Sequence, residues 1–149
     1  MASEALVDAN ILLRLLTNQP PELAQRAAVL LERAEQTGLE LVVAPFTIAE
    51  VVYVLQSVYH WDRDVVASRL LQFLSTSVVT VLDAAVVTRA LTWFLDVRQI
   101  AFADAYLSAL ATARCHGRVV SFDRDLRRLE GIEVIAQPGD LPHGAAGPQ

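Results

Sequence analysis

The fold of this chain is decided by the stretch ALVDANILL, residues 5–13, in which two apolar runs meet at a single acid, Asp8. The first run is too short for a helix and predicts a strand over residues 5–7. The second run predicts a short helix over residues 11–16, because Asn18 and two prolines follow it and stop a helix. The stretch therefore predicts a strand that passes into a helix directly after Asp8.

The same alternation of short apolar segments and helical segments continues as far as residue 135. Further strands are predicted over residues 41–43, 78–82, 118–122 and 131–135. Further helices are predicted over residues 22–36, 46–61, 62–74, 84–95, 102–116 and 125–129. This alternation predicts the α/β class with a mostly parallel sheet of four to five strands, whose ligand site lies at the carboxyl ends of the strands.

The length of 149 residues fits one domain, which we expect to span residues 1–136. Residues 137–149 are rich in Gly, Pro and Ala and are expected to form a flexible tail. Hydrophobic residues make up 54% of the chain and charged residues only 19%, below the ~25% usual in soluble domains. The surplus of apolar surface favours a homo-oligomer or a permanent protein partner.

All twelve basic residues are Arg, and the net charge is −5. The absence of Lys excludes the P-loop motif and Schiff-base chemistry, both of which require a lysine. No charge-free apolar stretch reaches the ~18 residues of a membrane span, and no signal-peptide pattern is visible, so we expect a cytoplasmic protein that does not enter a membrane. The lone Cys115 is expected to be a small buried hydrophobe rather than a reactive thiol.

Four acids stand alone inside apolar runs: Asp8, Glu50, Asp104 and Asp123. We expect Asp8 and Asp123 at strand ends and Glu50 and Asp104 in first helical turns, which places all four at one rim of a parallel sheet. Clustered carboxylates stay ionised only when a cation compensates them. With no Lys in the chain, the natural cation is a hard divalent ion, Mg²⁺ or Mn²⁺, which prefers oxygen ligands.

Each acid also has a purely structural interpretation, and the sequence leaves both open. Asp at a strand–helix junction is a common N-cap. The segment from Thr47 to Glu50 matches the capping box, with Thr47 as the N-cap. On a helical wheel Glu50 lies nearly opposite the main apolar stripe, although Phe46 and Tyr53 share its own face.

Nucleic-acid binding requires basic residues, which this acidic chain supplies only locally. Arg124, Arg127 and Arg128 follow Asp123 closely, and Arg14 lies one helix after Asp8. We expect these arginines to contact phosphates, the alternative being solvated helix charges.

The order of four motifs in the chain resembles that of the PIN-domain nucleases. The motifs are Asp8-Ala-Asn-Ile-Leu-Leu-Arg14, the helix around Thr47-Ile-Ala-Glu50, Phe102-Ala-Asp-Ala-Tyr106 and Ser121-Phe-Asp-Arg-Asp125. The resemblance covers about residues 4–135 and is greatest to the toxins of VapC-type toxin–antitoxin pairs. It implies a three-layer α/β/α fold and an acidic centre that uses Mg²⁺ or Mn²⁺.

The resemblance also implies a function and a set of site residues. Family members hydrolyse RNA of the tRNA or rRNA type, are usually homodimers and are held by a cognate antitoxin. By correspondence, Asp8, Glu50 and Asp104 match the core metal-binding acids and Asp123 the more variable fourth acid. The polar residues beside the site and a further assisting acid are Asn10, Ser121 and Asp125.

The predicted function is therefore a divalent-metal-dependent endoribonuclease, the toxin of a toxin–antitoxin module. Two alternatives remain open: a nuclease of the same fold in housekeeping RNA processing, and a non-catalytic PIN-like binding module whose acids serve only as caps.

Overall fold

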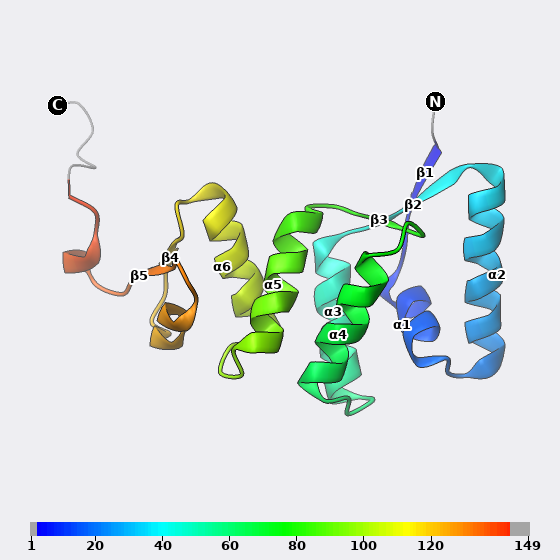
Figure 1. Ribbon diagram of the computed structural model, residues 1–149, viewed down its shortest axis with the longest axis horizontal. Helices are drawn as coiled ribbons and strands as arrows, with labels where there is room; N and C mark the ends of the chain where they lie inside the picture. The colour runs from blue at the N-terminus through cyan, green and yellow to red at the C-terminus, as the bar shows by residue number, and fades with distance from the viewer. Residues whose placement is uncertain (1–2, 144–149) are drawn as a thin grey trace.

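The computed structural model describes residues 3–143, in which helices and short strands alternate along an elongated molecule (Figure 1). The strands are β1 (Ser3–Leu6), β2 (Leu39–Val43), β3 (Thr80–Val81), β4 (Arg118–Val120) and β5 (Glu133–Ile135). The α-helices are α1 (Ala9–Thr17), α2 (Pro21–Thr37), α3 (Pro45–Ser57), α4 (Arg63–Leu74), α5 (Ala84–Asp96) and α6 (Phe102–Arg114). Two 3₁₀-helices complete the set, η1 (Arg124–Arg128) and η2 (Pro138–Asp140).

The strands form two parallel sheets. One has the order β1-β2-β3, with Leu6 opposite Val42, and the other pairs β4 with β5, with Val119 opposite Val134. The predicted α/β class and the parallel pairing are confirmed, and the five strands are divided into groups of three and two. In Figure 1 the first sheet lies toward the end of the molecule that holds α2, and β4 and β5 lie toward the opposite end.

Prolines and positive-φ residues set several helix boundaries. Pro21 and Pro45 occupy the first turns of α2 and α3, where a missing N–H costs no hydrogen bond. Gly38 ends α2 with φ +74°, a conformation that favours glycine. The prediction of Thr47 as an N-cap was wrong, because Pro45 starts α3 earlier and Ala44 is its N-cap.

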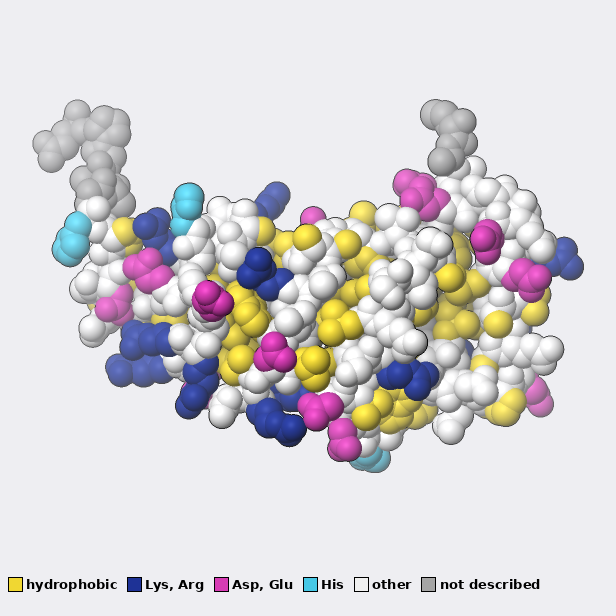
Figure 2. All heavy atoms as spheres, in the orientation of Figure 1, with side chains coloured by type: hydrophobic (Ala, Val, Ile, Leu, Met, Phe, Trp, Pro, Cys, Tyr) yellow, Lys and Arg dark blue, Asp and Glu magenta, His cyan; other side chains and the backbone are white. Residues whose placement is uncertain are grey.

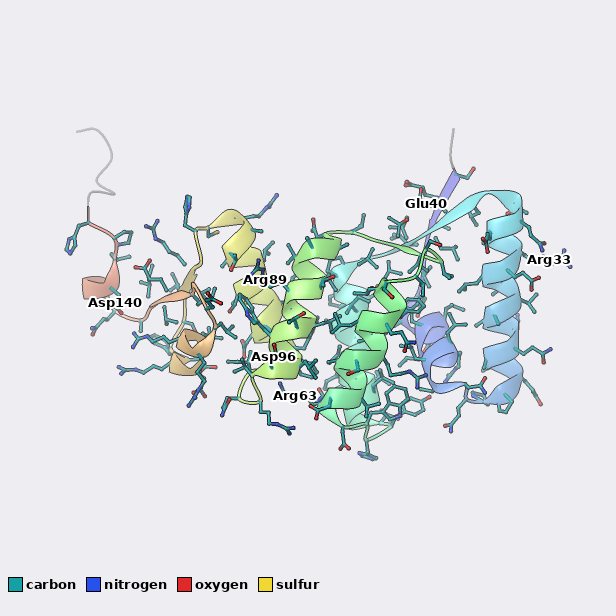
Figure 3. The ribbon with its side chains drawn as sticks, viewed as in Figure 1. Arg33, Glu40, Arg63, Arg89, Asp96 and Asp140 are labelled. Carbon is teal, nitrogen blue, oxygen red and sulfur yellow. The ribbon has the colours of Figure 1, made fainter. Side chains whose placement is uncertain are left out.

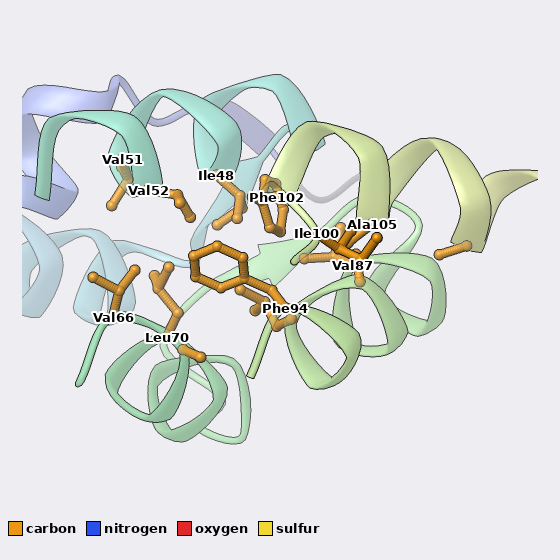
Figure 4. Packing of buried hydrophobic residues seen from close by; sticks show 14 of the residues in the cluster. Ile48, Val51, Val52, Val66, Leu70, Val87, Phe94, Ile100, Phe102 and Ala105 are labelled. Carbon is orange, nitrogen blue, oxygen red and sulfur yellow. The ribbon is translucent and has the colours of Figure 1, made fainter. Parts of the chain in front are cut away.

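The core joins four helices that lie next to one another in sequence. Figure 4 shows buried side chains of α3, α4, α5 and α6 meeting around Phe94. Phe94 is 1% exposed and meets Phe102 edge to face, with ring centroids 6.0 Å apart. This geometry is favourable for aromatic pairs, and the cluster fixes α6 against α3.

Arg63 ties the start of α4 to the end of α5, and its side chain is labelled in Figure 3. Its guanidinium donates to the carbonyl oxygens of Phe94 and Ile100, both at 2.7 Å, and lies 4.1 Å from the Phe94 ring centroid. Burial, followed by the nearby Arg98, lowers the pKa of Arg63, which stays charged because an arginine does not deprotonate in proteins. Arg63 thus serves the structure rather than a ligand.

The two ends of the last third of the chain differ from their predictions. Cys115 is exposed, because α6 ends at Arg114 and Cys115 lies beyond the packed face of the helix. Within the predicted tail, Pro138–Asp140 form η2, and residues 144–149 lie outside the described part of the chain. The Asp140 carboxylate accepts from the N–H groups of Ala136 (2.9 Å) and Gln137 (3.2 Å), which lowers its pKa.

Within residues 3–143, no helix combines the length and the apolar composition that crossing a bilayer requires.

Candidate functional site

Asp8 follows β1 and caps α1. Its Oδ1 accepts a hydrogen bond from the Asn10 N–H at 2.8 Å, so the predicted strand-to-helix junction and the capping role are both present. The residue is exposed. The cap uses one carboxylate oxygen, which leaves the second oxygen to another partner. Asn10 contributes its main chain here, and its side chain borders a hollow between α1 and α2.

Asp123 repeats this arrangement after β4. Its Oδ1 accepts from the Asp125 N–H at 2.9 Å and caps η1, while its own N–H donates to the Ser121 Oγ at 3.0 Å. The Asp125 carboxylate meets the Arg128 Nε at 3.2 Å. The structure therefore brings together Ser121, Asp123 and Asp125, as their sequence spacing predicts.

Glu50 and Asp104 lie on helices. Glu50 is exposed in α3, beyond the first helical turn expected for it, because Pro45 extends the helix at its start. Its neighbours on the same face, Phe46 and Tyr53, are 73% and 70% exposed. Asp104 is half-buried in the first turn of α6, as predicted, where a helix dipole favours a carboxylate.

The four acids do not form one cluster within a single chain. Among residues 3–143, no three side chains of the types Asp, Glu, His and Cys lie close enough to hold a metal ion together. Two of the acids, Asp8 and Glu50, belong to the segment around β1, β2 and α3, and the other two belong to the segment around α6 and β4. The chemistry of the donors suits Mg²⁺ or Mn²⁺, but the arrangement within one chain does not.

The arginines differ in their freedom to bind a ligand. Arg14 is half-buried and donates to the Tyr59 hydroxyl (3.1 Å) and the Gln19 carbonyl oxygen (3.2 Å), so it joins α1 to the segment after α3. Arg124 and Arg127 are exposed and line a polar hollow with Asp140. Figure 2 shows basic side chains gathered at the end of the molecule that holds β4 and η1.

A feature that sequence analysis missed lies on the outer face of β4 and β5. Val120 and Phe122 are 80% and 92% exposed and border an apolar hollow of about 360 Å³ together with Pro138 and Leu141. No local signal indicated this surface, because residues 118–122 have the pattern of one buried strand. The strand instead ends at Val120, and Phe122 projects beyond it.

The sequence matches the family model described as PIN domain over residues 5–132. The chain belongs to the PIN-domain family. No curated protein and no solved structure gives a significant match. PIN domains are generally nucleases that use divalent metal ions, so this PIN domain is a member of a hydrolase family that binds nucleic acid. The resemblance inferred from the four motifs is confirmed at the level of the family.

Proposed function

We propose that this PIN domain is a divalent-metal-dependent endoribonuclease that uses Asp8, Glu50, Asp104 and Asp123, and that it is the toxin of a toxin–antitoxin module. The observation that carries the proposal is the family match over residues 5–132 together with carboxylates at all four motif positions. Asp8 and Asp123 both follow parallel strands, the place where α/β proteins bind ligands.

The reaction class follows from the family and from the residues available. Hydrolysis of RNA adds water across a P–O bond, so the site must hold a negatively charged phosphodiester. Arg124 and Arg127 are exposed beside Asp123 and supply the positive charge that attracts phosphates. Asp125 is paired with Arg128, so its proposed part is to position that arginine near Asp123.

The donor set and its arrangement decide how far a metal mechanism can be derived. Carboxylate oxygens are suitable ligands, but one chain does not gather three of them among its described residues. We therefore derive no catalytic step through an ion bound to a single copy. The metal requirement is a prediction for the assembled protein.

The nuclease assay uses a fluorescent single-stranded RNA with Mg²⁺, Mn²⁺ or EDTA. We expect cleavage with either ion, none in EDTA, and none from Asp8→Asn. Asparagine caps helices as well as aspartate does, so this variant removes the charge while keeping the fold. Cleavage that continues in EDTA or in Asp8→Asn would contradict the metal mechanism, and absence of cleavage with every RNA would favour a non-catalytic binding module.

The toxin role and the housekeeping role are distinguished in cells. A toxin should arrest growth when expressed alone, and a small antitoxin gene beside its own gene should encode a protein that restores growth. We expect a cytoplasmic homodimer that acts on tRNA or rRNA. Unimpaired growth with an active nuclease would favour housekeeping RNA processing.

A further inference from the structure

Two strand edges stay unpaired within residues 3–143: the outer edge of β1 and one edge of β4. The Val7 N–H donates to the Val42 carbonyl oxygen at 2.9 Å, on the β2 side. Consecutive residues of a strand direct their main-chain groups to alternate edges, so Leu6 presents its groups to the free edge. By the same argument Val120 faces the free edge of β4, since the Ser121 N–H donates to Ile135 of β5.

These two edges carry exposed apolar side chains. Leu6 is 73% exposed, Val120 is 80% exposed, and Phe122 directly after β4 is 92% exposed. The strand on the other side of the small sheet differs, because Val134 and Ile135 of β5 are buried. A free, apolar strand edge is a template for pairing with another chain, and proteins usually cover or charge it.

Charge also differs between the parts of the chain that hold these edges. Residues 1–62 contain eight Asp and Glu and three Arg, which gives the whole net charge of −5. Residues 63–149 contain nine acids and nine Arg, and the segment 118–128 around β4 carries four Arg against two Asp. A contact between β4 and β1 therefore joins a basic segment to the acidic part of a chain, which favours that contact.

We propose that β4 of one copy pairs in parallel with β1 of a second copy, and that this pairing completes the candidate site from both copies. Each chain has one edge of each kind, so two copies related by a twofold axis supply both missing partners and leave neither edge open. In Figure 1 the edges lie toward opposite ends of the molecule, which suits two elongated chains lying side by side in opposite directions.

The pairing accounts for the division of the acids. Adjacent parallel strands bring their carboxyl ends together, so Asp8 after β1 of one copy lies beside Asp123 after β4 of the other. Glu50 comes with β2 through α3, and Asp104 comes with β4, since a helix that precedes a parallel strand starts near its carboxyl end. A group of three or more carboxylates, which one chain does not form among its described residues, then arises between two copies. The catalytic part of this inference rests on the proposed nuclease function, but the assembly does not.

Disulfide trapping tests the assembly without any assay of activity. Leu6→Cys and Val120→Cys are made separately in a Cys115→Ala background and co-expressed with different tags. Both positions are exposed, so the substitutions leave the chain core intact. We expect a covalent pair of the two chains under mild oxidation and a native mass about twice 16.3 kDa. Thr88→Cys, exposed on α5, replaces Leu6→Cys in the control and should give no pair.

The double variant Leu6→Cys with Val120→Cys decides between one chain and two. A disulfide between chains supports the proposal. A disulfide formed within one chain of monomeric mass overturns it, because the two edges then meet by closure of a single copy. An uncrosslinked monomer overturns it as well.

Complementation tests the shared site. Asp8→Asn and Asp123→Asn copies are each expected to be inactive, and their co-purified heterodimer is expected to regain about half the wild-type activity, since one of its two sites is intact. A crosslinked dimer with active wild type but no complementation overturns the shared site and leaves the nuclease standing. An inactive wild type with a crosslinked dimer refutes the proposed function and leaves the assembly standing.

Discussion

At the scale of the residue, Asp8 carries a structural and a chemical role that substitutions separate. Asp8→Ala should lose about 1 kcal/mol of stability, because the Asn10 N–H at the start of α1 loses its acceptor. Asp8→Asn should keep that stability, because asparagine is an equal cap, yet lose RNA cleavage. Chemical denaturation and the nuclease assay on the same preparations check both. Equal activity in Asp8→Asn and the wild type would reduce Asp8 to a cap.

Asp140 gives a pH dependence of local structure. Hydrogen bonds from the Ala136 N–H, and then from Gln137, lower its pKa, so the carboxylate stabilises η2 at any pH above the value of about 4 usual for a free Asp. That stabilisation is lost as the pH falls through the lowered pKa of the folded state. Amide exchange at Ala136 and Gln137 should accelerate at low pH, relative to other amides, in the wild type but not in Asp140→Asn. Equal relative protection at pH 6 and pH 3 would show that the carboxylate does not hold this segment.

At the scale of the element, the turn between α6 and β4 depends on Gly117. Its φ is +77°, and a Cβ there would lie 2.1 Å from the Gly131 carbonyl oxygen. Gly38 has nearly the same φ, +74°, but a Cβ added there would meet nothing within 4 Å, so it is a matched control. Gly38→Ala should cost about 1–2 kcal/mol from backbone strain, and Gly117→Ala about 2–5 kcal/mol, since overpacking adds to that strain.

Denaturant unfolding measures both glycine variants. Equal losses would show that the close approach of Gly117 to Gly131 is absent in solution. A larger loss in Gly117→Ala, together with weaker protection of the Glu133 N–H that donates to Gly117, would confirm that this glycine holds β4 against β5.

The sequence predicted the elements better than their limits. Apolar period and stop signals located every helix, because α2 and α5 each bury one continuous stripe. The start of α3 was misplaced since Thr47 offered a plausible cap, whereas Pro45 fitted the first turn and extended the helix. Strand β4 was predicted two residues too long, because an apolar run such as Val119–Phe122 does not reveal which residues find a partner strand.

At the scale of the whole molecule, local signals could predict the site residues but not their assembly. Asp8, Asp104 and Asp123 lie at the junctions that the pattern required. Their meeting depends on which strand pairs with β1, and that contact is set by tertiary structure rather than by residues near Asp8. The low charged fraction did indicate surplus apolar surface, which Leu6, Val120 and Phe122 now locate.

Metal binding and assembly should therefore be coupled. If the carboxylates come from two copies, Mg²⁺ binds the dimer in preference to the monomer and stabilises it. At an ion concentration about 100 times its Kd the gain is about 2.7 kcal/mol, which raises the Tm by roughly 5–10 °C for a chain of this length. The increase in Tm should grow with protein concentration at low micromolar levels, where an unliganded dimer dissociates.

Val120→Pro isolates this coupling. Proline removes the Val120 N–H, which points away from β5, so β4 keeps its partner while its free edge loses a donor for β1 of another copy. We expect a monomer whose Tm in EDTA stays near that of Val120→Ala but which gains little from Mg²⁺, whereas Val120→Ala keeps the full increase. Thermal melts of both variants with and without Mg²⁺, at two protein concentrations, make the measurement. A monomeric Val120→Pro that keeps the wild-type increase would place all the metal ligands within one chain.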